Sequence, residues 1–171
     1  MYDPNGGHLH PLNYTLGLAS AAEKAGTIIH EHSRVTRIEH GKSPKVYTDK
    51  GSVSCKHVAL CANAYLEGLE KQIDKKIMPV GTYILATEPL SKEEADKLIS
   101  DNAAVADILF VLNYFRLSGD RRMLFGGEVN YSAKDPSDIA KTMQKTMLEY
   151  FPQLAHKKID FAWGGNVAIT V

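Results

Sequence analysis

The sequence contains two different strand patterns, and a polar stretch at residues 67–76 separates them. Before this stretch, strand-forming runs are short, and Lys56–Ala62 is a continuous apolar run typical of a strand buried on both faces. After it, strand-forming runs are long and alternate with capped helices, as in antiparallel sheets. With 171 residues, the chain has room for one well-buried domain and part of a second. We expect two domains, residues 1–76 and 77–171, in an α+β or α/β fold.

The first part is expected to start with a helix from Pro11 to Ala25. Pro11 suits the first helical position, and Gly26 supplies a left-handed stop. A strand and then a β-hairpin are expected to follow, with Lys45–Thr48 leading into a turn at Asp49–Gly51. The short strands are expected at Thr27–His30, Arg34–Glu39, Lys45–Thr48 and Lys56–Ala62. This order predicts the back half of a parallel α/β sheet.

The second part is expected to form a mixed, largely antiparallel sheet with flanking helices. Its strands are expected at Met78–Thr87, Asp107–Arg116, Arg122–Gly127 and Ile159–Thr170. The residues Ser118–Arg121 predict a hairpin loop between the second and third of these strands, with positive φ at Gly119.

Capping signals predict two helices in the second part. Ser91 and Glu94 have the spacing of a capping box, which predicts a helix over Ser91–Ser100. Asp135 is the expected N-cap of the next helix, and Pro136 takes its first position. The apolar stripe of that helix is Ile139, Met143 and Met147, and it ends near Tyr150.

Charge and hydropathy narrow the range of partners. Lys+Arg and Asp+Glu both number 20, so the net charge is zero and no positive field is available for nucleic acid. No apolar run approaches the length of a membrane span, and the polar start at Met1–Asn5 does not resemble a signal peptide. We therefore expect a cytoplasmic protein with no nucleic-acid or membrane partner.

Cysteine and histidine spacings do not predict thiol or metal chemistry. Cys55 and Cys61 lie too far apart along an extended run to form a disulfide, so free thiols are expected. His8 and His10 share a face in extended chain, as do His30 and His32, but neither pair has a third ligand nearby. We expect no metal site.

Three glycine pairs lie next to runs of strand-forming residues: Gly6–Gly7, Gly126–Gly127 and Gly164–Gly165. Glycine weakens a strand unless a turn, a bulge or a flat ligand needs close approach to the backbone. Both explanations stay open for each pair. None of them has the G-x-G-x-x-G spacing of a dinucleotide-binding turn.

Tyr114 and Arg116 are the strongest candidates for binding a polar ligand. In a strand they lie on one face, where a hydroxyl and a guanidinium together suit a carboxylate or another polar substrate end. A solvent-facing arginine beside a half-buried tyrosine is the alternative. Trp163 is either a wall facing a ligand or a core residue, with the core favoured on composition.

Four ordered blocks resemble the D-amino-acid-oxidase-like superfamily of FAD-dependent oxidoreductases. The blocks are Tyr2–Pro11, Met78–Leu90, Tyr114–Gly127 and Phe161–Gly165. The resemblance covers essentially the whole chain but only the central part of the family's chain. The family's N-terminal βαβ unit and its C-terminal segment over the flavin have no counterpart, so the chain is expected to be a fragment.

The resemblance implies an amine or amino-acid oxidoreductase, in which FAD accepts a hydride from the carbon of a C–N bond. It implies that residues 1–76 are part of an FAD-binding domain and that residues 77–171 form the substrate-binding domain. The residues it places near FAD are His8, His10, Val35, Ala62, Asn63, Ala64, Gly164 and Gly165. Those it places near the substrate are Tyr114, Arg116, Gly126, Gly127 and Trp163. A small polyamine derivative is the expected substrate, which implies a role in polyamine catabolism.

Two further expectations concern the isolated chain. Without the phosphate-binding turn, it should bind FAD weakly or not at all and should be inactive by itself. A non-catalytic module that binds a small amine or amino acid is the alternative function. A third interpretation is self-association through a sheet edge left without its neighbour.

Overall fold

The computed structural model describes residues 2–132 and 134–170. These residues form two compact units, one of residues up to His10 together with 79–167 and the other of residues 11–78 with 168–170. The segment before Pro11 therefore packs with the later part of the chain, whereas the sequence placed it with residues 11–76. Long-range contacts hold it there, because His8 makes hydrogen bonds to Asn102 and Arg116.

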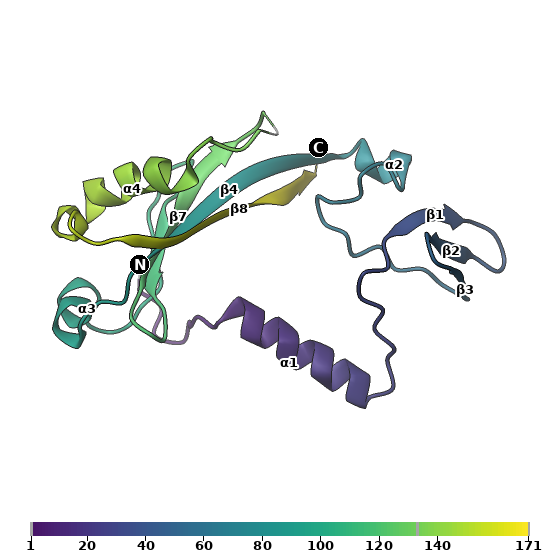
Figure 1. The fold of residues 1–171 in the computed structure, drawn as a ribbon, viewed down its shortest axis with the longest axis horizontal. Helices are drawn as coiled ribbons and strands as arrows, with labels where there is room; N and C mark the ends of the chain where they lie inside the picture. Colours follow the sequence, from purple (N-terminus) through teal and green to yellow (C-terminus); the bar gives the residue numbers. More distant parts are fainter. Residues whose placement is uncertain (1, 133, 171) are drawn as a thin grey trace. The chain divides into compact units, whose positions relative to one another are not determined.

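A five-stranded sheet forms the centre of the later unit, with strand order β5-β6-β7-β4-β8. The strands are β4 (Ile77–Thr87), β5 (Val105–Ala106), β6 (Tyr114–Leu117), β7 (Met123–Asn130) and β8 (Ile159–Thr170). β7 pairs antiparallel with both β4 and β6. β8 lies at the end of the sheet beside β4, as Figure 1 shows. The mixed α+β character expected for this part of the chain is confirmed.

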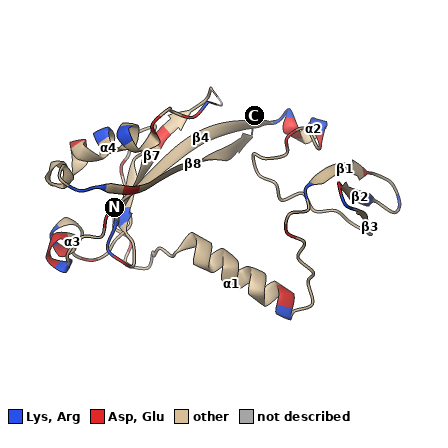
Figure 2. Cartoon of the chain, in the orientation of Figure 1, with Lys and Arg blue, Asp and Glu red and all other residues tan. Residues whose placement is uncertain are grey.

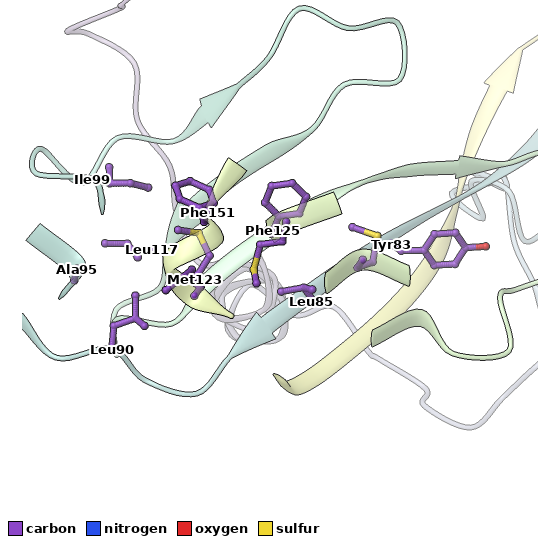
Figure 3. Packing of buried hydrophobic residues seen from close by; sticks show 12 residues of the cluster. Tyr83, Leu85, Leu90, Ala95, Ile99, Leu117, Met123, Phe125 and Phe151 are labelled. Carbon is purple, nitrogen blue, oxygen red and sulfur yellow. The ribbon is translucent and has the colours of Figure 1, made fainter. Parts of the chain in front are cut away.

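Helix α4 (Ile139–Tyr150) covers one face of this sheet. Met143 and Met147 point inward at i, i+4 spacing and are fully buried against strand residues such as Leu85 and Phe125. Figure 3 shows Phe125 and Leu85 side by side in this cluster, with Phe151 nearby. This apolar layer covers one face of the sheet, and the opposite face carries the side chains described below.

The helix caps agree with the sequence at one helix and differ at the other. Helix α3 (Lys92–Leu98) has the expected capping box, in which Ser91 accepts from the Glu94 N–H and Glu94 accepts from the Ser91 N–H. In α4 the N-cap is Asp138, which accepts from the Lys141 N–H, so the prediction of Asp135 was wrong. Asp135 instead accepts a hydrogen bond from the Tyr83 hydroxyl.

The strand expected over Asp107–Arg116 is a loop for most of its length. Only its last residues join β6, because the Asp107 carboxylate accepts from the backbone N–H groups of Leu109 and Asn113 and closes the loop on itself. In the turn between β6 and β7, the residue with positive φ is Arg121. The prediction of positive φ at Gly119 was therefore wrong.

The other unit contains α1 (Pro11–Lys24), the short helix α2 (Lys71–Asp74) and a three-stranded sheet. Its strands are β1 (Val35–Glu39), β2 (Lys45–Thr48) and β3 (Ser52–Ser54), and each neighbouring pair is antiparallel. The helix at Pro11 is as predicted, including positive φ at Gly26. The parallel sheet expected here is wrong for the strands that the structure describes.

Two strands predicted in this unit are absent from the described residues. Thr27–His30 and Lys56–Ala62 are irregular, and their side chains are largely exposed, for example Ile28 and Leu60. A strand needs a neighbour for its backbone N–H and C=O groups, and no described segment pairs with either run. Apolar composition alone therefore gave a wrong prediction at both places.

Candidate functional site on the second face of the sheet

Tyr114 and Arg116 lie on the face of the sheet that α4 does not cover. β6 and β7 pair with Tyr114 opposite Gly126 and Arg116 opposite Leu124. The alternate residues of β7, Met123 and Phe125, belong to the core under α4. Because successive side chains in a strand point to opposite faces, Tyr114, Arg116, Leu124 and Gly126 share the other face, which we call the Arg116 face.

His8 binds the Arg116 side chain on this face. His8 Nδ1 lies 3.0 Å from Arg116 Nη1, and His8 Nε2 lies 2.7 Å from the Asn102 carbonyl oxygen. A guanidinium can only donate and a carbonyl oxygen can only accept. His8 Nδ1 is therefore the acceptor and Nε2 carries the proton, which defines a neutral imidazole with one tautomer.

Arg116 has no carboxylate partner among the described residues. The ion pairs of the described chain involve other arginines, such as Arg122 with Asp120 and Asp160. Arg116 is half-buried, and a guanidinium in that position has further N–H donors available for an anion. The Arg116 face therefore has the chemistry to bind a carboxylate.

Gly126 provides room for the ring of Tyr114. A Cβ added at Gly126 would lie 2.2 Å from Tyr114 Cε2 and 2.7 Å from its hydroxyl oxygen. The ring therefore lies over Gly126 of the neighbouring strand. This glycine is explained by a contact within the chain, and no ligand is needed to account for it.

Gly127 belongs to the opposite face, where it accommodates Asn113. A Cβ at Gly127 would lie 2.4 Å from Asn113 Oδ1, and Asn113 is buried. The amide of Asn113 donates to Asp107 Oδ2 at 2.9 Å, and Tyr150 donates to the same oxygen at 2.7 Å. Burial acts to raise the pKa of Asp107, but the hydrogen bonds from Tyr150 and Asn113 outweigh it and lower the pKa.

This polar cluster of Asp107, Asn113 and Tyr150 was missed in the sequence. Asp107 and Asn113 bracket the apolar run at residues 108–112, and such bracketing by Asp and Asn is a signal for a self-closed loop. The loop leads directly into Tyr114, so the cluster fixes the start of β6.

Trp163 also belongs to the Arg116 face. A Cβ at Gly164 would lie 2.6 Å from the ring of Tyr83, which is a core residue on the α4 face. Trp163 and Gly165 flank Gly164 in the strand and therefore belong to the opposite face, which is the Arg116 face. Trp163 is 45% exposed and lies outside the core cluster, so the interpretation favoured on composition was wrong.

The residues that the resemblance assigns to FAD occur in both units. His8, His10, Gly164 and Gly165 belong to the unit of residues 79–167, whereas Val35 and Ala62–Ala64 belong to the unit of residues 11–78. Asn63 has positive φ, and its side-chain oxygen accepts from the Ala168 N–H at 3.0 Å. Among these residues, His8 contacts the Arg116 face through its hydrogen bond to Arg116.

Two of the hollows on the described surface are lined by residues that are not assigned to FAD or substrate. One adjoins the three-stranded sheet and is lined by residues such as His40, Lys56 and His57. The other lies along α4 and β7, between Glu128, Lys141 and Lys145.

Among the described residues, no group of His, Cys, Asp and Glu has the arrangement of a metal site, and Cys55 and Cys61 are free. No described helix is long and apolar enough to span a membrane.

Comparison with known proteins shows the family of the chain. Residues 1–170 match the family described as DAO, FAD dependent oxidoreductase. The chain is 42% identical to gamma-glutamylputrescine oxidoreductase of Escherichia coli over 172 residues, which cover 100% of this chain and 40% of that relative. The chain therefore belongs to the DAO family of FAD-dependent oxidoreductases, and it spans 40% of the length of this relative.

Solved structures give the same fold. L-Proline dehydrogenase from P. horikoshii superposes with a TM-score of 0.73 at 18% identity, over 94% of this chain and 44% of that one. Glycine oxidase from Geobacillus kaustophilus superposes with a TM-score of 0.69 at 17% identity, over 91% of this chain and 41% of that one. At such identities the likeness concerns the fold alone.

The described residues fit only part of an FAD site. Binding the FAD pyrophosphate usually takes a glycine-rich turn at a helix N-terminus, and the sequence has no G-x-G-x-x-G. The chain's own side chains fill the space beside three of the glycines assigned to ligands. Tyr114 lies beside Gly126, Asn113 beside Gly127 and Tyr83 beside Gly164. FAD is the cofactor of the family.

Proposed function

We propose that this chain supplies the substrate-binding face of an FAD-dependent oxidoreductase that acts on the C–N bond of a small amine or amino acid carrying a carboxylate. One observation supports it above the others. Arg116 is half-buried, bonded to a neutral histidine and without a carboxylate partner among the described residues. An anionic group on the substrate would supply that partner. In this proposal the unit of residues 79–167 binds substrate, and residues 11–76 contribute to the FAD-binding domain.

The residues of this chain would bind and orient the amine. Arg116 and the hydroxyl of Tyr114 would hold the carboxylate end, and Trp163 would form an apolar wall on the same face. When bound, FAD supplies the acceptor for the hydride that leaves the amine carbon. The product imine hydrolyses to an aldehyde and an amine or ammonia. His10, Val35, Ala62, Asn63, Ala64 and Gly165 remain proposed neighbours of the cofactor.

The substrate we propose is gamma-glutamylputrescine or a compound with the same groups, because it combines a carboxylate with a primary amine. The relative from Escherichia coli carries this compound in its name and is 42% identical over the whole chain. With this substrate, the proposed role is in polyamine catabolism, and the proposed location is the cytoplasm.

The test replaces the matching segment of the Escherichia coli relative with residues 1–171 and measures oxidation of gamma-glutamylputrescine. An active graft supports the proposal. A folded graft that binds FAD but does not oxidise the amine contradicts it. Calorimetry of the separate chain decides the alternative, since heat on adding gamma-glutamylputrescine would favour a non-catalytic binding module.

A second proposal concerns self-association through β8. β8 lies at the end of the sheet, and Phe161–Thr170 contains no charged residue or proline to protect that edge. Figure 2 shows this strand almost without charge. Edge pairing of two copies would appear as a dimer in gel filtration. A monomer at every concentration tested would contradict it.

A further inference from the structure

The contact between His8 and Arg116 joins segments that lie far apart in the sequence. His8 lies in the irregular N-terminal segment before α1, and Arg116 lies in the middle of β6. An arginine side chain has several rotatable bonds and loses considerable entropy when it is fixed. A partner that fixes it before a ligand arrives lowers the cost of binding that ligand.

The carbonyl oxygen of Asn102 determines which His8 nitrogen carries the proton. Asn102 has positive φ (54°), and its N–H bonds to the carbonyl of Ile99 just after α3. This left-handed conformation at a helix end is one that asparagine adopts readily. It directs the Asn102 carbonyl at His8 Nε2, at 2.7 Å. The opposite ring nitrogen is then left as an acceptor for Arg116.

We propose that His8 is a positioning residue for Arg116, held as the neutral Nε2–H tautomer by Asn102 so that the guanidinium is fixed on the Arg116 face for the carboxylate of a substrate. The proposal deepens the proposed function and rests on it for the identity of the ligand. The positioning itself is a property of the chain alone. A neutral imidazole is suited to this work because it orients the guanidinium without neutralising its charge, whereas a carboxylate would compete with the substrate.

The first measurement is the tautomer of His8 in the full chain, read from the ¹⁵N shifts of its two ring nitrogens. We expect Nε2 to carry the hydrogen and Nδ1 to be an acceptor. A ring protonated at Nδ1 in its neutral form would overturn the proposal, because it could not accept from Arg116. This measurement does not depend on any substrate.

The second measurement compares three chains by NMR titration with acetate, followed at the Arg116 Nε–H signal. His8→Phe removes the acceptor, and we expect acetate to bind about tenfold more weakly, which corresponds to a lost hydrogen bond to a charged group. His8→Asn places an amide oxygen near the position of Nδ1 and should keep most of the wild-type affinity. Exposed His30, changed to Phe, is the matched control and should have no effect.

The outcomes separate this inference from the proposed function. Equal acetate affinity in the wild type and in both His8 variants overturns the positioning role while leaving Arg116 as a substrate residue. Loss in His8→Asn equal to that in His8→Phe also overturns it, because the acceptor would then be irrelevant. If acetate does not shift Arg116 in any chain, the proposed carboxylate site fails, and the tautomer measurement still decides the geometry of His8.

Discussion

The ring of Tyr114 lies directly over Gly126 on the neighbouring strand, so close that a Cβ at Gly126 would fall 2.2 Å from the ring. β6 and β7 pair these two residues opposite each other. An aromatic ring that covers a cross-strand glycine is a known way to fix strand register. Here it also fixes the tyrosine of the proposed substrate face, two residues from Arg116.

Gly126→Ala should destabilise the chain and displace Tyr114. The added methyl group overlaps the ring, and overpacking of this kind costs about 1–3 kcal/mol. Urea unfolding measures the cost. Gly51→Ala is the control, because no atom lies within 4 Å of its added Cβ, and it should be close to neutral. Equal stability of the two variants would contradict the packing of Tyr114 over Gly126.

Asp138→Ala should remove the N-cap of α4. The carboxylate of Asp138 accepts from the Lys141 N–H at 2.9 Å, and losing such a cap costs about 1 kcal/mol. Thermal unfolding should show a lower midpoint for this variant. Ser137→Ala, at an exposed position one residue earlier, should leave the midpoint nearly unchanged. A larger effect in Ser137→Ala than in Asp138→Ala would be evidence against this cap.

Glu94 should make stability depend on pH in acid. Hydrogen bonds from the Lys157 ammonium and the Ser91 N–H lower the pKa of Glu94 to about 2. A lowered folded-state pKa contributes stability above the unfolded value, near 4.5, and that contribution is lost as pH falls toward 2. Glu94→Gln should therefore flatten the pH dependence of the urea midpoint in this range. Glu93→Gln should keep the wild-type profile, and parallel profiles for all three proteins would refute the prediction.

The separate chain should not hold FAD. It lacks the turn that binds the pyrophosphate, and Gly126 on the Arg116 face is covered by the ring of Tyr114. Gel filtration of the chain mixed with FAD should separate a colourless protein from free flavin. A yellow protein peak with bound flavin would show that the remaining residues suffice.

Local signals in the sequence predicted much of the fold. The capping box at Ser91, the stop at Gly26 and the stripe through Met143 and Met147 depend on neighbours in the sequence, and all three are confirmed. Lys56–Ala62 failed because a strand depends on a partner elsewhere, and apolar composition does not show whether one is present. The prediction of Asp135 as the N-cap of α4 was wrong because Asp138, three residues later, can cap the same helix. Only the structure shows that Asp135 binds Tyr83 instead.

The candidate site could be predicted in part. Strand alternation placed Tyr114 and Arg116 together, and the register confirms that they share a face. The contact with His8 could not be predicted, because no periodicity links a loop residue to a strand so far along the chain. The close approach of Asn113 to Gly127 and of Tyr83 to Gly164 likewise depends on which face each strand presents.

The central claim is that Arg116 binds the carboxylate of the amine substrate, and kinetics of the graft into the Escherichia coli relative test it most directly. Arg116→Met should raise KM for gamma-glutamylputrescine about tenfold or more, since a charge-assisted hydrogen bond is lost. Lys50→Met, at an exposed turn, should leave KM unchanged. Equal KM values for Arg116→Met and the unmodified graft would contradict the claim.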